Sequence, residues 1–401
     1  MSVIMKFGGT SVGTIEKIHQ VAQHIKKVKE EEQHVVIVVS AMGKSTDHLI
    51  QLAKQVSNNL DKREIDTLLA TGEQQTIALL SIALNGIGVD AISLTGFQAG
   101  FKTTSTHTKS IIKDVDVSRV MTHLKEGKVV VVAGFQGMSD TGDITTLGRG
   151  GSDTSAVALA AKLGYKCEIY TDVDGIYTVD PRVYKDASKL DYISYDELME
   201  MASKGAGVIE TRSVELASKF HVPLYIARSL SVKGSGTYIM EQNYLFEEKP
   251  ITGISITDDV VMVTLESSFN GVKDIKDVFN VISSENINLD MISQNIDKLN
   301  KLVISFSIDL EDLDTLKECM KNNESVFGKF TTDTTKDLVK IGLVGVGMAS
   351  NFGVAAKVFD ILSDQGVVFY TVSTSEISIS CTVDKQNKEE AVSALAIGFN
   401  L

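Results

Sequence analysis

Residues 35–39 read Val-Val-Ile-Val-Val, an uninterrupted run of β-branched side chains that ends at Ser40-Ala41-Met42-Gly43. Similar short apolar runs occur at Val129–Ala133 and Cys167–Tyr170. A strand that is apolar on both faces is typical of a parallel sheet covered by helices on both sides. The run at 35–39 therefore predicts the centre of such a sheet.

Helical patterns lie between these runs. Apolar residues recur at helical spacing in Ile15–Lys29, Arg63–Leu84 and Asp153–Leu163. Strands that alternate with helices indicate an α/β domain with a mostly parallel sheet sandwiched by helices. We assign this domain to residues 1–240.

The rest of the chain contains an internal duplication. Residues 241–249 are polar and acidic and precede Pro250, so we interpret them as a linker. Two units that match at a constant offset of 80 residues follow. The pairs Val278-Phe279, Ile282-Ser283 and Ile292-Ser293 correspond to Val358-Phe359, Leu362-Ser363 and Val372-Ser373. We assign the two βαβ-containing modules to residues 241–330 and 331–401, with a C-terminal strand that can return to the first of them.

Composition excludes several classes of partner. The 401 residues exceed what one core usually fills, so two or three domains are expected. The formal net charge of -13 argues against a nucleic acid or an anionic membrane surface, because both favour a basic face.

The N-terminus lacks the basic lead and long apolar region of a signal peptide, and the longest apolar runs are too short to cross a bilayer. Three widely spaced cysteines fit a reducing compartment. We therefore expect a cytoplasmic protein.

The first of three glycine-rich turns is Lys6-Phe7-Gly8-Gly9-Thr10-Ser11-Val12-Gly13. Glycines at the end of a strand let backbone N–H groups approach an anion, and a following helix start adds a favourable dipole. The lysine precedes the glycines, so the spacing is not that of a P-loop. A structural turn with a surface lysine is an equally good interpretation of this motif alone.

The second turn is Leu147-Gly148-Arg149-Gly150-Gly151-Ser152-Asp153-Thr154, at a predicted helix start. Ser152 or Asp153 could simply cap that helix. Capping does not explain an arginine among three glycines, so we favour a functional interpretation. Arg149 is suited to a bidentate contact with a carboxylate.

The third turn is Thr171-Asp172-Val173-Asp174-Gly175-Ile176-Tyr177, followed by Asp180-Pro181-Arg182. It indicates a rigid loop at the carboxyl edge of the sheet, although Asp-Gly by itself is a common turn. Thr71-Gly72-Glu73 is predicted to open a helix. Glu73 is then either a surface acid favoured by the helix dipole or, with Arg149, one of two opposite charges for the ends of an α-amino acid.

Neither a Ser-His-Asp arrangement nor a His and Cys metal cluster is evident in the sequence. Phosphoryl transfer requires neither of them, because positioning and charge neutralisation supply most of its catalysis.

Together these motifs closely resemble the aspartate kinase family, within the amino acid kinase superfamily, over nearly the whole chain. The resemblance rests on KFGGTSVG at 6–13, VVSAMG at 38–43, TGE at 71–73, LGRGGSDT at 147–154, TDVDGIYT at 171–178, DPR at 180–182 and ISYDELMEMA at 193–202. The two repeats resemble ACT domains, which are α+β, ferredoxin-like modules that sense amino acids, on DMISQN at 290–295 and STSEISIS at 373–380.

The resemblance implies that ATP phosphorylates the side-chain carboxylate of L-aspartate, the first step of lysine, threonine and methionine biosynthesis. Lys6 and Asp153 would be catalytic: Lys6 would contact the transferring phosphate, and Asp153 would order the phosphates, Lys6 and Mg²⁺. The residues implied to bind aspartate are Ser40, Thr46, Glu73, Arg149 and Ser152. Those implied to bind ATP are Lys6, Gly8, Gly9, Ser11, Thr171, Asp172, Tyr177, Asp180 and Arg182. Mg²⁺ would be held mainly through the nucleotide phosphates, without a protein metal site.

The same resemblance implies feedback inhibition at the repeats, by lysine alone or with threonine. The implied effector contacts are Asp290, Gln294, Asn295, Met348, Ser350, Thr374, Ser375 and Glu376. The alternative is that the Ser and Thr residues only terminate strands and that Met348 belongs to the core. We expect a homodimer or homotetramer held partly through the repeats.

The sequence departs from the family pattern in two places. Gly207 stands where many relatives carry a lysine thought to approach the ATP phosphates, and Lys204 is a candidate substitute. Phe269-Asn270-Gly271 and Asn351-Phe352-Gly353 stand where a turn with proline before the glycine is usual.

Three alternative functions remain open from the sequence alone. The chain could be a kinase for glutamate or acetylglutamate, or a catalytically inactive amino-acid sensor, which Gly207 alone favours. An internal start such as Met240 could also supply a separate regulatory subunit.

Overall fold

A computed structural model of the chain describes residues 2–231, 234–241, 249–268, 272–285, 287–298 and 301–401. The chain divides into two compact units, which we describe separately. The first comprises residues 1–177, 189–202 and 207–244, and the second comprises residues 178–188, 203–206 and 245–401. Most of the predicted linker, residues 242–248, lies outside the described residues.

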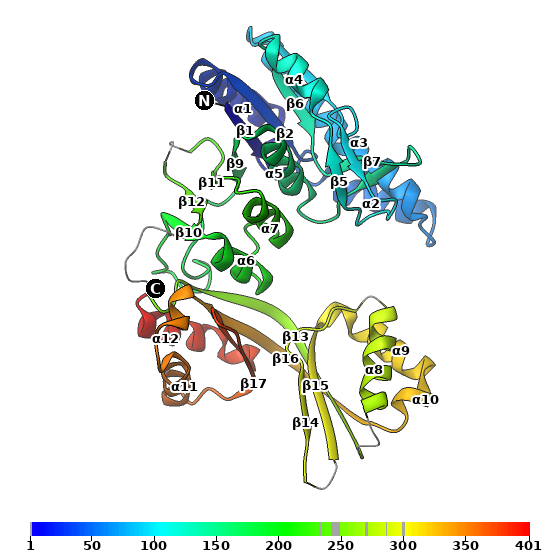
Figure 1. The fold of residues 1–401 in the computed structure, drawn as a ribbon, viewed down its shortest axis with the longest axis vertical. Helices are drawn as coiled ribbons and strands as arrows, with labels where there is room; N and C mark the ends of the chain where they lie inside the picture. Colours follow the sequence, from blue (N-terminus) through cyan, green and yellow to red (C-terminus); the bar gives the residue numbers. More distant parts are fainter. Residues whose placement is uncertain (1, 232–233, 242–248, 269–271, 286, 299–300) are drawn as a thin grey trace. The chain divides into compact units, whose positions relative to one another are not determined.

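The first unit is built on an eight-stranded sheet with the order β10-β12-β11-β9-β1-β2-β6-β3 (Figure 1). Its strands are β1 (Ser2–Phe7), β2 (His34–Val39), β3 (Ala91–Leu94), β6 (Val129–Ala133), β9 (Lys166–Thr171), β10 (Tyr192–Ser194), β11 (Leu224–Arg228) and β12 (Thr237–Met240). The six strands from β11 to β3 are parallel, and β12 pairs antiparallel with β11. The prediction of a mostly parallel sheet is therefore confirmed.

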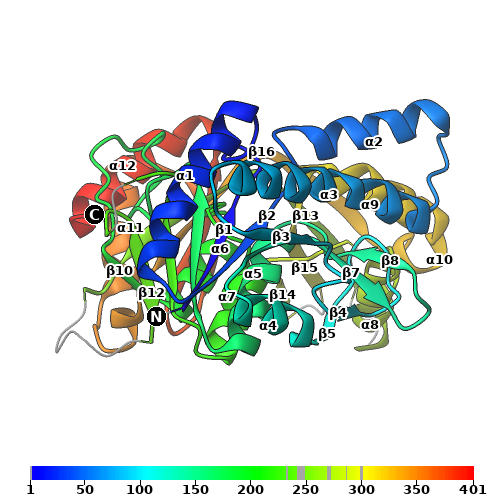
Figure 2. The same cartoon turned by 90° about the horizontal axis from the view of Figure 1, so that it is seen from above.

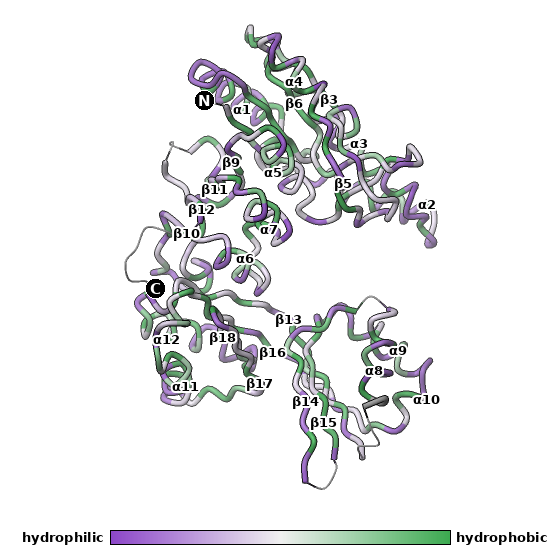
Figure 3. The backbone as a smooth tube through the Cα atoms, in the orientation of Figure 1, coloured by the Kyte–Doolittle hydropathy of each residue, from purple (hydrophilic) through white to green (hydrophobic). Residues whose placement is uncertain are grey.

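Helices cover both faces of this sheet, as its apolar strands require. The helices are α1 (Ile15–Glu31), α2 (Ser45–Val56), α3 (Lys62–Gly86), α4 (Ser118–Lys125), α5 (Gly151–Leu163), α6 (Tyr195–Ser203) and α7 (Thr211–Lys219). Helices α1 and α3 pack with alternate residues of β1 and β2 in one apolar cluster, while α5 lies on the opposite face (Figure 2). Figure 3 shows β6 as hydrophobic and the outer end of α2 as hydrophilic.

A second, four-stranded sheet with the order β5-β4-β7-β8 belongs to the same unit. It consists of β4 (Phe101–Thr103), β5 (Ile112–Val115), β7 (Gln136–Ser139) and β8 (Ile144–Thr146). Strand β8 packs against α3, so the loop from β8 into α5 begins beside that helix.

The second unit contains a six-stranded antiparallel sheet with the order β14-β15-β13-β16-β18-β17. The strands are β13 (Gly253–Ser268), β14 (Ser293–Ile296), β15 (Lys301–Asp309), β16 (Thr331–Val344), β17 (Phe369–Thr374) and β18 (Ser378–Asp384). The helices are α8 (Val272–Ser284), α9 (Leu313–Asn322), α10 (Glu324–Phe327), α11 (Val354–Asp364) and α12 (Lys388–Phe399), with short 3-10 turns at Leu310–Asp312, Val346–Ala349 and Lys385–Asn387.

The duplication seen in the sequence is visible in this unit. Helices α8 and α9 of the first repeat correspond to α11 and α12 of the second, and β14 and β15 correspond to β17 and β18. The matched residues Val278 and Val358 are both fully buried, each in the core of its own repeat. Each repeat therefore has the predicted α+β architecture.

Strands β13 and β16 run through both repeats. Residues 253–257 pair with 340–344, while residues 262–266 pair with 331–335, on the other side of an irregularity. The described chain ends in α12, not in the C-terminal strand that we expected. The reason is the helical spacing of its buried apolar residues, Ala391, Val392, Leu395, Ala396 and Phe399. The first half of β13, which lies within the range 241–330 assigned to the first repeat, pairs with residues 340–344 of the second repeat.

A helix that crosses a membrane must be both long and apolar, and the helices within the described ranges lack this combination.

Candidate active site

Four parallel strands, β9, β1, β2 and β6, end at one edge of the large sheet and bring their loops together. The N–H of Gly8, just after β1, donates to the carbonyl of Tyr170 in β9 at 3.1 Å. The N–H of Gly43, in the loop after β2, donates to the carbonyl of Gly9 at 2.9 Å. A Cβ at Gly9 would lie 2.7 Å from the carbonyl oxygen of Ala41. Glycine is required there for the close approach of the two loops.

Lys6 and Asp153 form an ion pair at this edge. Lys6 Nζ lies 2.7 Å from Asp153 Oδ1, and the two side chains are only 9% and 12% exposed. Lys6 comes from β1 and Asp153 from the first turn of α5. A Cβ at Gly8 would lie 3.6 Å from Lys6 Nζ, so the ammonium is beside the glycine loop. Three features at this edge are suited to an anion. They are the ammonium of Lys6, the backbone N–H groups of the glycine loops and the N-terminus of α5.

The loop from β8 into α5 depends on its glycines. Gly148 and Gly150 have φ angles of +81° and +61°, a left-handed conformation that favours glycine. The guanidinium of Arg212 donates to the carbonyl of Leu147 at 3.1 Å and fixes the start of this loop. Arg149 is exposed, and across the described ranges it forms no ion pair or side-chain hydrogen bond. Its guanidinium is accessible to a ligand.

Helix α5 is not capped by a side chain. Its N-cap is Gly150, and no side chain accepts a capping hydrogen bond from the N–H groups of the first turn. The interpretation that Ser152 or Asp153 caps this helix is therefore wrong, because both residues lie inside the first turn. Ser152 is buried against Gly134, where a Cβ would lie 2.8 Å from Ser152 Cβ.

The prediction that Thr71-Gly72-Glu73 opens a helix is wrong. Helix α3 begins at Lys62, and the carboxylate of its N-cap, Asp61, accepts from the N–H groups of Arg63 and Glu64. Glu73 therefore lies in the helix interior, and it is only 3% exposed. The interpretation of Glu73 as a surface acid favoured by the helix dipole is therefore also wrong, because it required a helix start at this position.

The carboxylate of Glu73 is only half satisfied. Its Oε1 accepts from the N–H of Ala41 at 3.0 Å, while Oε2 is buried without a hydrogen-bond partner among the described residues. Burial raises the pKa of Glu73 to about 7, although the Ala41 hydrogen bond opposes the shift. Glu73 and Arg149, both described, do not pair with each other. A buried acid with an unused oxygen is suited to a cationic ligand group.

The residues predicted on the nucleotide side fall in two places. Thr171 ends β9, and its hydroxyl donates to Asp172 at 3.1 Å. Tyr177 donates its hydroxyl to Asp174 at 3.2 Å, and burial followed by the Asp174 charge raises the pKa of this phenol.

Asp180 and Arg182 belong to the second unit. The guanidinium of Arg182 donates to the Asp180 carboxylate, at 2.7 Å from Nη2 to Oδ2, and this contact lowers the pKa of Asp180. Their place on the nucleotide side stays a prediction.

Sequence reasoning missed Ser229. Its N–H donates to the carbonyl of Thr171 at 3.0 Å, and its hydroxyl lies 2.5 Å from that of Ser11. The available signal was its position directly after the apolar strand Leu224–Arg228, at the same sheet edge.

The remaining predicted contacts are less constrained. Ser40 donates its N–H to the carbonyl of Phe7 at 3.2 Å, and Thr46 lies in the first turn of α2, partly exposed. A Cβ at Gly207 would meet nothing within 4 Å, so the absent lysine leaves open space. Lys204, the candidate substitute, lies in the second unit, and its ammonium donates to Ser380 Oγ at 2.8 Å.

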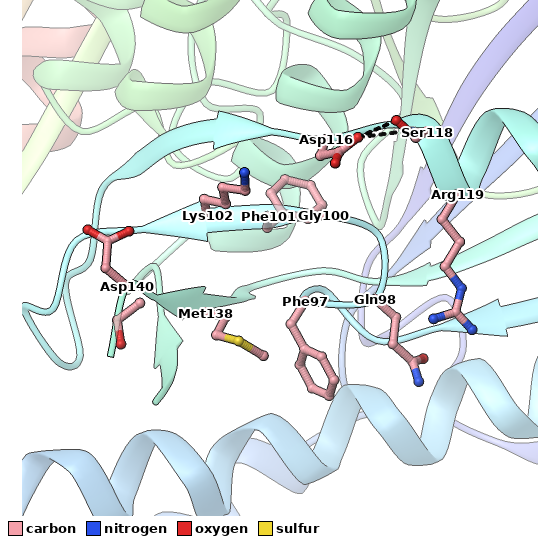
Figure 4. Close-up of a pocket in the computed structure, with 11 residues that line it drawn as sticks. Phe97, Gln98, Gly100, Phe101, Lys102, Asp116, Ser118, Arg119, Met138 and Asp140 are labelled. Carbon is pink, nitrogen blue, oxygen red and sulfur yellow. Dashed lines mark hydrogen bonds between the residues drawn. The ribbon is translucent and has the colours of Figure 1, made fainter. Parts of the chain in front are cut away.

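A hollow of about 490 Å³ lies beside the four-stranded sheet. Figure 4 shows residues that line it, among them Phe97, Lys102, Arg119 and Met138. None of the residues predicted for the active site lines it. The chemistry described above therefore does not depend on this hollow.

In the second unit, the predicted effector residues lie in an ion pair, on strand β14 and in two turns. Asp290 pairs with Lys340, a buried cation on β16. Gln294 and Asn295 are exposed on β14. Met348 packs against the core of the second repeat. The other members, Ser350, Thr374, Ser375 and Glu376, are exposed.

Two of these observations agree with the structural alternative. Met348 contributes to a core, and Ser375 Oγ lies 2.9 Å from Ser378 Oγ across the turn between β17 and β18. Gly353 begins α11 with a φ of +84°, as the turn motif of the second repeat predicts. The corresponding turn of the first repeat, residues 269–271, lies outside the described residues.

A parallel sheet whose edge joins glycine loops, a buried lysine and a helix N-terminus defines an amino acid kinase. Residues 1–228 match the model of the amino acid kinase family, and residues 341–399 match an ACT domain. The chain is 45% identical to Aspartokinase 2 of Bacillus subtilis over 400 residues, covering 100% of this chain and 98% of that protein. It is also 45% identical to an aspartokinase of Geobacillus stearothermophilus, covering 100% of this chain and 97% of the relative.

Solved structures agree. Aspartokinase III of E. coli, in complex with aspartate and ADP, matches with a TM-score of 0.85 at 21% identity, over 100% of both chains. Aspartate kinase of Synechocystis matches at 41% identity with a TM-score of 0.55, over 100% of this chain and 69% of that one. The chain belongs to the aspartokinase family and is a phosphotransferase with ACT regulatory domains.

Proposed function

We propose that the enzyme transfers the γ-phosphate of ATP to the side-chain carboxylate of L-aspartate. The observation that carries this proposal is the buried ion pair between Lys6 and Asp153, beside the glycine loop and the N-terminus of α5. E. coli aspartokinase III, which shares the fold, was crystallised with aspartate and ADP, which supports this choice of ligands.

In this reaction a carboxylate oxygen of aspartate attacks the γ-phosphorus, the bond to the bridging oxygen breaks, and ADP leaves with the electron pair. Lys6 and the N-terminus of α5 would stabilise the charge on the transferring group. Asp153 would hold the ammonium of Lys6 in place. Mg²⁺ would arrive with the nucleotide phosphates, because the described residues offer no group of three or more His, Cys, Asp or Glu side chains that could hold it.

Opposite charges would orient the amino acid. The exposed guanidinium of Arg149 would bind its α-carboxylate, and the unused oxygen of Glu73 would accept from its ammonium. Ser40, Thr46 and Ser152 would add hydrogen bonds. Acetylglutamate has no ammonium and would leave the Glu73 carboxylate unpaired, so this arrangement disfavours it. Turnover with aspartate, glutamate and acetylglutamate, measured side by side, tests the choice.

ATP would lie along the loops that follow β1 and β9. Gly8, Gly9 and Ser11 would contact its phosphates, and Thr171, Asp172, Tyr177, Asp180 and Arg182 would lie on the nucleotide side, as the family resemblance implies. The space around Gly207 is open, and the family resemblance implies a lysine at this position in many relatives. The remaining cations at this edge, Lys6 and Arg149, keep the kinase chemistry available.

The ACT repeats would bind the inhibitor, lysine alone or with threonine. The pair of Asp290 with buried Lys340 supports this site, because Asp290 follows α8 of the first repeat while Lys340 lies in the part of β16 that pairs with the second. E. coli aspartokinase III was also crystallised with lysine and aspartate. We further propose a cytoplasmic homodimer or homotetramer in lysine and threonine biosynthesis.

Replacing Lys6 or Asp153 with alanine tests the catalytic assignment. Each change removes one charge of the pair, so we expect aspartyl phosphate formation to fall at least about 100-fold. The product is trapped with hydroxylamine and quantified. Loss of one partner from a buried pair also costs about 3 kcal/mol of stability or more, so each variant is assayed below its own unfolding midpoint.

Lys29→Ala provides the matched control. Lys29 is a lysine of α1 whose ammonium donates to the carbonyl of Gln33, away from the sheet edge. Its loss should leave turnover within about twofold. Near-normal turnover in folded Lys6→Ala or Asp153→Ala would overturn the assignment.

A further inference from the structure

Asp66 is a fully buried carboxylate of α3 that the active-site assignment does not use. The N–H of Thr108 donates to both of its oxygens, at 3.1 Å and 3.0 Å. The hydroxyl of Thr146 donates to Oδ1 at 2.6 Å, and His107 Nδ1 lies 2.9 Å from Oδ2. The Thr108 N–H and the Thr146 hydroxyl are donors here, so Asp66 accepts from two separate segments of the chain. A buried acid satisfied in this way holds several segments of chain in one arrangement.

The position of Asp66 on α3 is informative. It precedes Glu73 by seven residues, which is two helical turns, so the two carboxylates lie on one face of the helix. Glu73 accepts from Ala41 in the loop after β2, while Asp66 accepts from Thr146 at the end of β8. One face of one helix therefore holds two loops of the active site.

Thr108 carries the first connection from Asp66 to the Arg149 loop. Its φ of +68° is unusual for a β-branched residue, and the hydrogen bonds to Asp66 hold its N–H in this conformation. A Cβ at Gly148 would lie 3.1 Å from the carbonyl oxygen of Thr108. Thr108 therefore packs directly on the residue that precedes Arg149.

Thr146 carries the second connection. Its hydroxyl donates to Asp66, and its carbonyl accepts from both the N–H and the hydroxyl of Ser110, each at 2.9 Å. Thr146 precedes Arg149 by three residues. The loop that presents Arg149 is thus held at two points. The side chain of Thr146 bonds to Asp66, and the backbone of Gly148 packs against the carbonyl of Thr108.

We propose that Asp66 is a positioning residue for the amino-acid substrate. It sets the conformation of the loop that presents Arg149, and so the geometry with which the guanidinium meets the α-carboxylate, without touching substrate itself. The inference rests on the proposed role of Arg149. It assigns a function to a helix carboxylate that belongs to none of the glycine-rich motifs.

Asp66→Asn tests the proposal. The amide matches the carboxylate in size, but its NH₂ is a donor that must face the donors of Thr108 or Thr146. We expect the KM for aspartate to rise about tenfold, which corresponds to the loss of one charge-assisted hydrogen bond. The KM for ATP should change less, within about twofold, because the glycine loop proposed to bind its phosphates follows β1 and makes no contact with Asp66 among the described hydrogen bonds. Steady-state kinetics with each substrate varied give both values.

Thr146→Val removes one hydrogen-bond donor to Asp66 and changes no residue of α3. It tests the role of Asp66 even if Asp66→Asn fails to fold. We expect a rise in the KM for aspartate of about threefold. The double variant should resemble Asp66→Asn alone, since both changes act through one contact.

Asp61→Ala is the structural control, because it removes the N-cap of the same helix away from the loop. It should lower the unfolding midpoint and leave both KM values unchanged. An unchanged KM for aspartate in Asp66→Asn and Thr146→Val, or an equal rise in Asp61→Ala, would overturn the inference.

Arg149→Ala separates this inference from the function on which it rests. If Arg149→Ala raises the KM for aspartate and the Asp66 and Thr146 variants do not, only the role of Asp66 fails. If Arg149→Ala leaves that KM unchanged, the assignment of Arg149 fails with it.

Discussion

At the scale of single residues, Glu73 has a charge that changes within the usual assay range. Its pKa is raised to about 7 by burial, and its free oxygen is where the substrate ammonium would bind. Protonation removes this attraction. We therefore expect the KM for aspartate to rise as the pH falls below 7, approaching tenfold for each pH unit. Steady-state kinetics between about pH 5.5 and pH 9 measure the profile, and Glu73→Gln should flatten it. A profile that is identical in the two proteins would contradict the assignment.

The same shift predicts how stability depends on pH. The native pKa of Glu73, about 7, lies above its ordinary value of 4.5, so the native state binds the proton more tightly than the unfolded state. The resulting stabilisation is complete below pH 4.5 and is lost as the pH rises through 7. Glu73→Gln should therefore be more stable than the natural protein at about pH 8, by up to about 3 kcal/mol, and nearly equal to it at about pH 4.5. Urea unfolding at the two pH values measures the difference. A difference that does not vary with pH would show that the buried Glu73 carboxylate is not its cause.

The sequence predicted some residues of the site and not others, for a physical reason. Arg149 stands between two glycines and Lys6 lies two residues before a pair of them, and the unusual backbone requirements of glycine are visible in the sequence. Asp66 and Ser229 stand in an ordinary helix and after an ordinary strand. Their importance follows from burial and from contacts across 80 and 218 positions of the chain, which no local pattern contains.

At the scale of elements, α3 shows why a helix can contain a glycine. The helical pattern over Arg63–Leu84 is confirmed by α3, whereas a helix start at Thr71-Gly72-Glu73 is wrong, even though glycine weakens a helix interior. The structure gives Gly72 a purpose: a Cβ at Gly72 would lie 2.8 Å from the Cβ of Ala41. The missing side chain lets α3 approach the loop after β2, so that Glu73 reaches the N–H of Ala41.

Gly72→Ala tests this account. Despite the better helix propensity of alanine, we expect a loss of about 1 to 3 kcal/mol in the free energy of unfolding, because the added methyl group overpacks a buried contact. The KM for aspartate should rise as Glu73 is displaced. Gly86→Ala, in the last turn of the same helix, is the control, since its Cβ would meet nothing within 4 Å. It should be neutral or stabilising by up to about 1 kcal/mol. Equal effects at the two positions would contradict the packing argument.

Elements also differed in how well the sequence predicted them. The run at 129–133 is a strand with those bounds, because every one of its residues is buried. The four-stranded sheet was not predicted. Its strands have only three or four residues, and β5 is mostly exposed, so neither length nor alternation distinguishes them from loops.

At the scale of the whole molecule, the duplicated repeats form one sheet and not two. Strands β13 and β16 are long enough to serve both repeats, while each repeat keeps an apolar core of its own. The 80-residue offset predicted two copies, but not the shared strands, because pairing between residues 253–257 and 340–344 leaves no periodic signal. The ion pair of Asp290 with Lys340 joins the two halves of this sheet. An effector that binds there would contact both repeats at once.

The proposed effector site predicts how feedback inhibition would be lost. Turnover is first measured with lysine, threonine, methionine and the lysine–threonine pair, and we expect lysine, alone or with threonine, to inhibit. Asp290→Asn should then raise the half-inhibitory concentration at least about tenfold, because the carboxylate that would accept from the effector ammonium is gone. Asp333→Asn, an exposed acid on β16, provides the control and should leave that concentration unchanged.

The two variants differ in one respect. Asp290→Asn leaves the buried ammonium of Lys340 without its carboxylate, so that only a ligand carboxylate or solvent can compensate its charge, whereas Asp333→Asn does not. Thermal unfolding of the Asp290→Asn variant shows whether the sheet itself has been weakened. If a stable Asp290→Asn variant remains as sensitive to its inhibitor as the natural protein, the effector does not bind at Asp290. The pair with Lys340 would then serve only to fasten one repeat to the strand it shares with the other.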